Sequence, residues 1–236
     1  PSLLDFTFNG WGLKFASDLD NRITRHAVEA EVLKGHYVNR LGFVLEGGSI
    51  ESDGMGALLT TSECLLSPNR NGQKNKVEIE EYLKSVFQVR QILWLDDGYL
   101  AGDDTDSHID TLARFCPADT IVYVQCEDET DEHYEALQAM EEQLHSFRTL
   151  NGEPYRLLAL PMADKVVEEG ERLPATYANF LILNGTILYP TYNQPENDRR
   201  ACEVLQEAFP GYQMVGIDCR PLIKQHSSLH LSLIHI

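Results

Sequence analysis

Apolar residues recur every three or four positions in four stretches of the chain, which is the spacing of amphipathic helices that bury one face. The first stretch should stop at Gly35. The second has the clearest start signal, because Asn75 stands three residues before Glu78, the spacing of a capping box. The four helices are predicted over about Leu19–Leu33, from Asn75 through Phe87, from near Thr130 through Phe147, and from Asn197 to Pro210-Gly211.

Short runs rich in β-branched and aliphatic residues lie between these helices and predict strands. The runs Phe180–Leu183 and Thr186–Tyr189 flank Asn184-Gly185, which predicts a tight hairpin because both turn positions need positive φ. Several strands and one helix recur roughly four times, about every 50–65 residues, and so predict a pseudo-symmetric α/β assembly rather than a doubly wound sheet. The remaining strands are predicted over Ala57–Thr61, Gln91–Leu95, Thr120–Val124, Tyr155–Leu160 and Met214–Asp218.

The composition limits the classes of partner. A length of 236 residues lies between one and two domains of ordinary size, and 43% hydrophobic residues exclude wholesale disorder. Nineteen basic residues against 37 acidic ones give a formal charge of −18. That charge argues against binding to nucleic acid and to anionic membranes, and it suits a small cationic ligand. Solubility alone also explains an acidic chain.

The five cysteines are widely spaced and include no Cys-x-x-Cys pair. An odd number without close pairs argues against a disulfide framework or a zinc ribbon, and favours a reducing compartment. No apolar run approaches the length of a membrane span, and no signal peptide opens the chain, which begins with Pro1.

One candidate for chemistry is the carboxylate of Glu46, which stands directly before Gly47 and Gly48. Glycines allow the backbone to approach a ligand closely, so Glu46 could face that ligand. The alternative is a glycine-rich hairpin with a solvated Glu46, and the segment taken alone favours this alternative.

A second candidate is the acidic segment from Asp96 to Asp110, which holds six Asp and no Lys or Arg. Like charges without compensation suggest a cation or a functional role. If this segment is extended, His108 and Asp110 project to one side. The spacing does not match an EF-hand, and a zinc site would need more His or Cys nearby. A surface acidic turn and a catalytic His–Asp pair both remain open.

Several of these segments, taken in order, resemble one family: the agmatine deiminases and their bacterial peptidylarginine deiminase relatives, of the guanidino-group-modifying superfamily. The resemblance runs from about Leu4 to His230. It implies a pentein fold, a five-bladed α/β propeller of ββαβ-type repeats, with about four blades here. Residues 1–230 would then form a single catalytic domain, truncated at both ends. The segments are Phe8-Asn9-Gly10-Trp11-Gly12, Glu46-Gly47-Gly48, Asp103–Asp110, Ala175–Phe180 with Asn184-Gly185, and Asn197-Asp198.

The resemblance also implies a chemistry. A guanidinium is planar and stays protonated at physiological pH, so carboxylates can hold it with paired hydrogen bonds. Glu46 and Asp110 match the family's carboxylate positions, and His108 matches its general acid/base. The family's nucleophile is a Cys thiolate that attacks the guanidinium carbon. Trp11 and Asp104 are expected to contact the substrate, and neither a metal nor an organic cofactor is required.

The sequence departs from the family pattern in four places. Ser107 replaces a common Gly before the His, and Ser228 follows Ser227 in a region that is similarly Gly-rich in the family. An upstream Asp that helps to hold the substrate falls before the first residue. The nucleophilic Cys is expected at the position of Leu231 and is absent.

The tail 231–236 is expected to be non-native. Codons able to encode it match a transposon end used in preparing sequencing libraries, which suggests a gene fragment read through into adapter. The alternative is a natural variant without the Cys.

The leading functional hypothesis is an agmatine deiminase, which hydrolyses agmatine to N-carbamoylputrescine and ammonia in putrescine biosynthesis. The alternatives are a deiminase of peptidyl-arginine or free arginine, and a catalytically dead guanidino-binding module. As written, the chain is expected to be inactive. The expected partner is a small cationic guanidino compound and the expected location is the cytoplasm; assembly into a homo-oligomer stays open.

Overall fold

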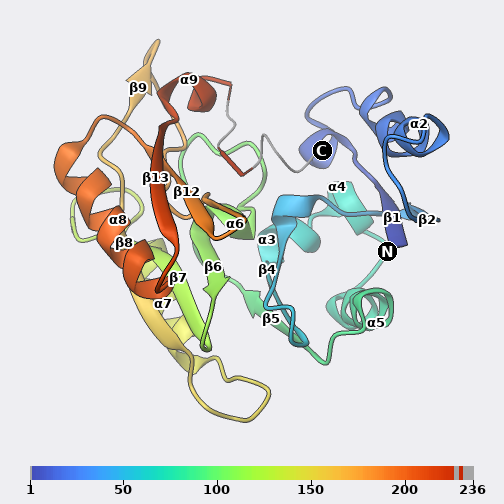
Figure 1. Cartoon of the computed structure of the whole chain (residues 1–236), viewed down its shortest axis with the longest axis horizontal. Helices are drawn as coiled ribbons and strands as arrows, with labels where there is room; N and C mark the ends of the chain where they lie inside the picture. The colour runs from blue at the N-terminus through green and yellow to red at the C-terminus, as the bar shows by residue number, and fades with distance from the viewer. Residues whose placement is uncertain (1, 226–228, 231–236) are drawn as a thin grey trace.

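The computed structural model describes residues 2–225, 229 and 230, and its mixed α/β elements form four helix-bearing units (Figure 1). Three units share one topology: two strands form an antiparallel hairpin, a helix follows, and a third strand pairs parallel to the second. These units are β3 (Ile50–Ser52), β4 (Ala57–Thr61), α5 (Lys76–Phe87) and β5 (Gln91–Leu95); β6 (Ala113–Cys116), β7 (Thr120–Gln125), α7 (Tyr134–Ser146) and β8 (Arg156–Pro161); and β11 (Leu181–Leu183), β12 (Thr186–Thr191), α8 (Pro195–Ala208) and β13 (Gln213–Asp218).

The remaining unit comes first in the chain and contains one parallel strand pair. Its strands are β1 (Ser2–Thr7) and β2 (His36–Val44), and the helix between them is α2 (Ile23–Glu29). Two short elements precede α2, namely α1 (Gly10–Leu13) and the 3-10 helix η1 (Asp20–Arg22).

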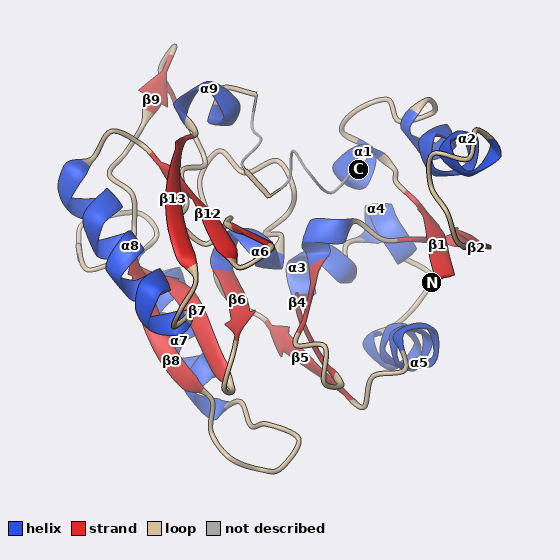
Figure 2. Ribbon diagram, in the orientation of Figure 1, coloured by secondary structure: helices blue, strands red, loops and turns tan. Residues whose placement is uncertain are grey.

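Short helices occupy the segments that lead from one strand to the next, and several of them gather between the sheets (Figure 2). The segments that follow β2 and β5 leave the ends of parallel strands and enter this region between the sheets. The short elements are η2 (Gly47–Ser49), α3 (Ser62–Leu65), α4 (Pro68–Asn71), α6 (Ile109–Leu112), α9 (Arg220–Ile223) and the hairpin β9 (Val167–Glu168) and β10 (Glu171–Arg172).

The apolar side chains form two buried clusters. The larger joins the β6–β8 and β11–β13 units with α7 and α8, and the smaller packs α5 against β4, β5 and the end of β2. Ile79 and Leu83 of α5 are fully buried in the smaller cluster, as the apolar spacing of this helix predicts.

Several predicted elements are confirmed by the structure. β4 and β5 have the predicted bounds. The side chain of Asn75 accepts a hydrogen bond from the Glu78 backbone at 3.1 Å, and the Glu78 carboxylate accepts one from the Asn75 backbone at 2.8 Å. The capping box is therefore present. Asn184 and Gly185 have φ of 48° and 79°, as the predicted turn requires.

The prediction of a helix over Leu19–Leu33 is wrong at both ends. The helix proper begins at Ile23, and Glu31 ends it in the left-handed region with φ of 57°. The Val32 N–H donates to the Ala27 carbonyl at 2.9 Å and the Glu31 N–H donates to the Val28 carbonyl at 3.0 Å, which is a Schellman ending. No residue of α2 is buried, so its apolar face does not pack into a core.

Other differences concern elements with weak sequence signals. The fourth helix begins at Pro195 rather than after Asn197, because proline fits the first helical turn and Asp198 accepts hydrogen bonds from the backbone of Tyr192 and Gln194. Strands β1, β2, β3 and β6 were not predicted; β2 has only one buried residue, Phe43, and so lacks a clear alternation.

The predicted recurrence of one helix with several strands is confirmed for four units, while the family's count of five blades stays a prediction. Among the described residues, the longest apolar stretches of helix fall short of what crossing a bilayer needs.

Candidate active site

Glu46 follows β2, and the structure buries it with only 5% of its surface exposed. Its two carboxylate oxygens accept hydrogen bonds from Arg70, Nε to Oε1 at 3.0 Å and Nη2 to Oε2 at 2.9 Å. His108 Nε2 lies 2.5 Å from Oε2. Burial alone would raise the pKa of Glu46, but His108 and Arg70 lower it below its usual value. The alternative of a solvated Glu46 in a hairpin is therefore wrong.

Arg70, on α4, compensates the charge of the acidic segment. Besides Glu46, its guanidinium donates from Nη1 to Asp106 Oδ2 at 2.5 Å and from Nη2 to the Thr105 carbonyl at 2.9 Å. Lys14 adds a second cation, 2.5 Å from Asp106 Oδ1. The acidic cluster was expected to need a cation or a functional role, and the structure supplies two cations from distant parts of the chain.

His108 and Asp110 are brought together by a helix start rather than by an extended segment. His108 precedes α6 as its N-cap, and Asp110 lies in the first turn. The two side chains are 1% and 0% exposed, so the alternative of a surface turn is wrong for this pair. Burial alone would lower the pKa of His108, but contacts with Cys64 and Glu46 raise it well above its ordinary value.

The backbone of Gly48 approaches both groups closely. A Cβ built on Gly48 would lie 2.7 Å from His108 Nδ1 and 2.9 Å from each carboxylate oxygen of Asp110. Both side chains therefore face one point on the backbone of η2. The second glycine of the Glu-Gly-Gly motif is needed because a larger residue would push these groups away.

His230 completes the buried group from the other end of the chain. Its Nδ1 lies 2.9 Å from Asp110 Oδ2, and its backbone N–H donates to Asn179 Oδ1 at 2.7 Å. Asn179 also donates to the Asp110 carbonyl at 3.3 Å. The expected nucleophile position, Leu231, and the tail 231–236 lie outside the described residues, as do Ser227 and Ser228.

Trp11 lies in an unusual turn. Four successive residues, Gly10 to Leu13, have φ between 54° and 82°, a conformation that L-residues rarely adopt. Asn9 holds the turn, since its side chain accepts a hydrogen bond from Gly12 N at 3.0 Å and donates to the Asn69 carbonyl at 2.6 Å. The indole makes edge-to-face contacts with Phe8 and Phe15.

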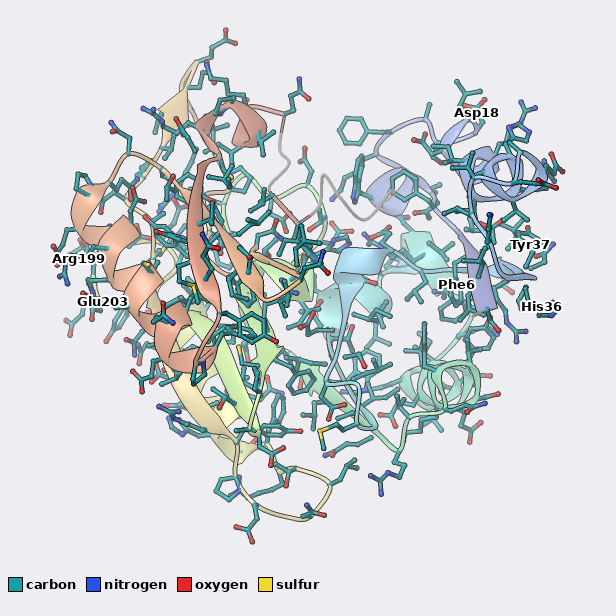
Figure 3. All side chains as sticks on the ribbon, viewed as in Figure 1. Phe6, Asp18, His36, Tyr37, Arg199 and Glu203 are labelled. Atoms are coloured by element: carbon teal, nitrogen blue, oxygen red, sulfur yellow. The ribbon has the colours of Figure 1, made fainter. Side chains whose placement is uncertain are left out.

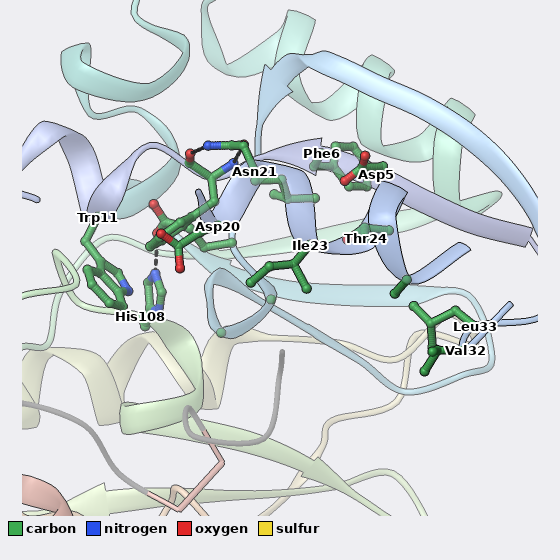
Figure 4. Close-up of a pocket in the computed structure, with 16 residues that line it drawn as sticks. Asp5, Phe6, Trp11, Asp20, Asn21, Ile23, Thr24, Val32, Leu33 and His108 are labelled. Carbon is green, nitrogen blue, oxygen red and sulfur yellow. Dashed lines mark hydrogen bonds and ion pairs between the residues drawn. The ribbon is translucent and has the colours of Figure 1, made fainter. Parts of the chain in front are cut away.

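The site opens onto a cavity of about 460 Å³. This volume is in the range of small-molecule sites. Figure 4 shows Trp11, Asp20 and His108 at one end of the cavity and Val32 and Leu33 at the other. Its lining joins the first unit to the buried group, and consists of Asp5, Phe6, Phe8, Trp11, Asp20, Asn21, Ile23, Thr24, Ala27, Val32, Leu33, Leu45, Glu46, Gly47, Gly48 and His108.

Of the predicted site residues, Glu46, His108 and Trp11 line the cavity, and Asp110 lies directly behind Gly48. Asp104 is not among the lining residues; its backbone carbonyl accepts a hydrogen bond from Lys14 at 2.6 Å. Ser107, which replaces a common glycine, has φ of 57°. That backbone conformation explains why glycine suits this position.

Arg70, Asn179 and Cys64 are the partners that sequence reasoning did not assign to the site. The Cys64 sulfur lies within 4.8 Å of donor atoms of both Glu46 and His108. These three donors would suit zinc, yet Arg70 occupies both oxygens of Glu46 and places a positive charge beside them. We therefore assign no metal here. The sequence showed Arg70 only as an arginine near the motifs, which could meet a substrate carboxylate or be structural.

The fold and sequence match known proteins over nearly the whole chain. The model of the Porphyromonas-type peptidyl-arginine deiminase family matches residues 1–233. A protein of Marinomonas named "Putative agmatine deiminase" is 34% identical over 94% of this chain and 65% of its own length.

Two solved structures are similar throughout. One, from Porphyromonas gingivalis and named "Putative Arginine Deiminase", is 54% identical with a TM-score of 0.94, covering 98% of this chain and 68% of its own. The other, a variant of C. jejuni agmatine deiminase with substrate bound, is 44% identical with a TM-score of 0.89, covering 97% and 66%.

The chain spans about two thirds of the length of the curated relatives it matches. The family match extends from the first unit through the buried Glu46–His108–Asp110 group and the cavity beside it. This chain therefore belongs to the Porphyromonas-type peptidyl-arginine deiminase family, together with proteins named as agmatine deiminases.

Proposed function

We propose that this protein is a guanidino-group deiminase whose substrate is agmatine, and that the reaction yields N-carbamoylputrescine and ammonia on the route to putrescine. The observation that carries the proposal is the buried Glu46–His108–Asp110 group at a cavity with carboxylate lining. The described lining residues include three acids and no Lys or Arg. A guanidinium is a permanent planar cation and is attracted to such a site.

In the proposed reaction, Glu46 and Asp110 hold the guanidinium nitrogens and orient the central carbon. A thiolate adds to that carbon, and His108 donates a proton to the departing ammonia. His108 then takes a proton from water as the water attacks the amidino–thioether carbon, and the thiolate leaves. One water is consumed and one ammonia released. A protonated His108, which its raised pKa favours, suits the first of these steps.

The thiolate is the missing part of the proposal. The family position falls on Leu231, outside the described residues, so the chain as written should bind without turnover. Cys219 is fully buried, and burial raises its pKa to about 11. Cys64 is also fully buried, although its sulfur lies within 4.8 Å of donor atoms of Glu46 and His108. We assign the nucleophile to the family position, and Cys64→Ser tests that assignment.

The experiment is calorimetric titration of the chain with agmatine, alongside an assay for ureido product and ammonia. We expect binding by the chain, weaker binding by Glu46→Gln, and turnover by Leu231→Cys but not by Leu231→Ser. Turnover by the unaltered chain that disappears in Cys64→Ser would overturn the assignment of the nucleophile. Absence of agmatine binding would overturn the proposed function.

A second candidate, a guanidino-binding protein without catalysis, is favoured by one observation, the Leu at position 231. It predicts that Leu231→Cys binds agmatine without turning it over. A deiminase of free arginine is less favoured. An α-carboxylate usually needs a cation, and the described residues of the cavity wall offer none except His108. Peptidyl-arginine has no free α-carboxylate, so the assay includes an arginine peptide beside agmatine.

A further inference from the structure

Asp20 is a carboxylate in the cavity that the proposed reaction does not use. It opens the 3-10 helix η1, is half-buried, and lines the cavity with Trp11, Glu46 and His108. The other two acids of the lining are engaged: Asp5 accepts a hydrogen bond from Tyr37 at 2.7 Å, and Glu46 is held by Arg70 and His108. The Asp20 carboxylate makes no hydrogen bond or ion pair with any residue that the structure describes.

The surroundings of Asp20 suit an alkyl ammonium rather than an anion. Trp11 lines the cavity with Asp20, and an indole ring attracts a cation that comes within reach of its face. The longer apolar part of the wall, made by Phe8, Ile23 and Val32 among others, can contact methylene groups. Figure 4 shows Asp20 at the same end of the cavity as Trp11 and His108.

We propose that Asp20 binds the free ammonium group of the substrate and so selects guanidino compounds that carry a second cation. The inference rests on the proposed function, which places the guanidinium at Glu46 and Asp110. A dication would then meet two separate carboxylate positions at once, with its guanidinium at Glu46 and its ammonium at Asp20. Arginine, whose α-carboxylate would accompany its amine, gains less because that carboxylate meets an acidic wall.

The test compares two ligands that differ only in the amine. Agmatine and butylguanidine share the guanidinium and the four-carbon chain, and butylguanidine ends in a methyl group. We expect the chain to bind agmatine about tenfold more tightly at low salt, a preference between that of an exposed ion pair and that of a charged hydrogen bond. The preference should shrink as salt is added, since ions screen a half-exposed pair.

Asp20→Asn should abolish the preference and leave butylguanidine affinity within about twofold, because the amide keeps the shape and removes the charge. Asp20→Glu should keep most of the preference. Asp18→Asn is the matched control: it removes an exposed carboxylate two residues away that does not line the cavity, and it should change nothing (Figure 3).

The outcomes separate this inference from the proposed function. If Asp20→Asn keeps the full preference for agmatine, the inference is wrong, while binding of both guanidines would still support the proposed site. If the chain binds neither guanidine, the proposed function fails and the inference with it. If Asp20→Asn and Asp20→Glu lower the affinity for agmatine and for butylguanidine equally, Asp20 shapes the cavity and does not bind the amine. That result also overturns the inference.

Discussion

His108 Nε2 and Glu46 Oε2 lie 2.5 Å apart, so the candidate acid/base and the candidate guanidinium-binding carboxylate form one buried pair. Each shifts the titration of the other in the direction that keeps both charged. The pKa of His108 is raised and the pKa of Glu46 is lowered. The pair therefore couples the folding of the chain to pH.

The pH dependence of stability should follow from these shifts. The contribution of His108 is full below its unfolded pKa, 6.5, and is lost as the pH rises through its higher folded pKa. The contribution of Glu46 is full above 4.5 and is lost as the pH falls through its lower folded pKa. We expect the free energy of unfolding in urea to be highest between these values. Glu46→Gln should flatten the alkaline side.

The control for this experiment is His26→Gln, which removes an exposed imidazole on α2. It should leave the pH profile unchanged. If the profile of Glu46→Gln matches that of the unaltered chain above pH 6.5, the pair does not hold the proton on His108.

Removing the guanidinium of Arg70 should be strongly destabilising. Its side chain is 1% exposed and hydrogen-bonds both Glu46 and Asp106, so Arg70→Met leaves Glu46 with His108 alone and Asp106 with Lys14 alone. Breaking a buried pair in this way costs about 3–5 kcal/mol. Arg70→Lys should recover part of this loss, because an ammonium keeps the charge but cannot form the paired hydrogen bonds to Glu46. Chemical denaturation measures both.

Arg199→Met is the matched comparison. Arg199 pairs with Glu196 and Glu203 on the outer face of α8, where all three side chains are more than half exposed (Figure 3). Its loss should change the unfolding free energy by no more than about 0.5 kcal/mol. A similar cost for Arg70→Met and Arg199→Met would contradict the buried network.

Gly48→Ala should damage the site. The added methyl would lie under 3.0 Å from His108 Nδ1 and from the Asp110 carboxylate, so one or both must move. Overpacking of this kind costs about 1–3 kcal/mol. We also expect weaker binding of agmatine, measured by calorimetry. Gly42→Ala is the control, because Gly42 is exposed in β2 and a Cβ there meets nothing within 4 Å. Normal ligand affinity in Gly48→Ala would show that the close approach does not matter.

The backbone strain at Ser107 can be measured by comparing two substitutions. Ser107 has φ of 57°, and its hydroxyl donates to Glu63 at 3.0 Å. Ser107→Gly and Ser107→Ala both remove that hydrogen bond, but only glycine adopts the conformation without steric cost. Ser107→Gly should therefore be more stable than Ser107→Ala by about 1 kcal/mol. Equal stability of the two variants would argue against strain.

Local signals in the sequence predicted the local elements well. The Asn75–Glu78 box and the Asn184-Gly185 turn depend on residues within a few positions of each other, and both are present. The prediction for the first helix failed because its end depends on Glu31 adopting a positive φ. Such a conformation is uncommon for a residue other than glycine, and the local sequence pattern does not predict it.

The candidate site was predictable only in part. The Glu-Gly-Gly and His-x-Asp motifs left alternatives open when taken singly, and the resemblance to a family singled out Glu46, His108 and Asp110, which the structure brings together. The motifs could not show that Arg70 would sit against Glu46, or Lys14 against Asp106. These contacts join segments that are far apart in the chain, and charge counts within one segment do not reveal them.

That separation has a consequence for how the protein is made. Arg70 and Glu46 are 24 residues apart in the sequence, His108 and Glu46 are 62 apart, and His230 and Asp110 are 120 apart. Contacts of such long range form late in folding, because the entropy cost of closing a large loop comes before the contact stabilises the chain. During synthesis, the His230–Asp110 contact cannot exist until nearly all of this stretch has left the ribosome. Until then, the charged groups that the folded protein buries remain solvated in the incomplete chain, without the partners that will neutralise them.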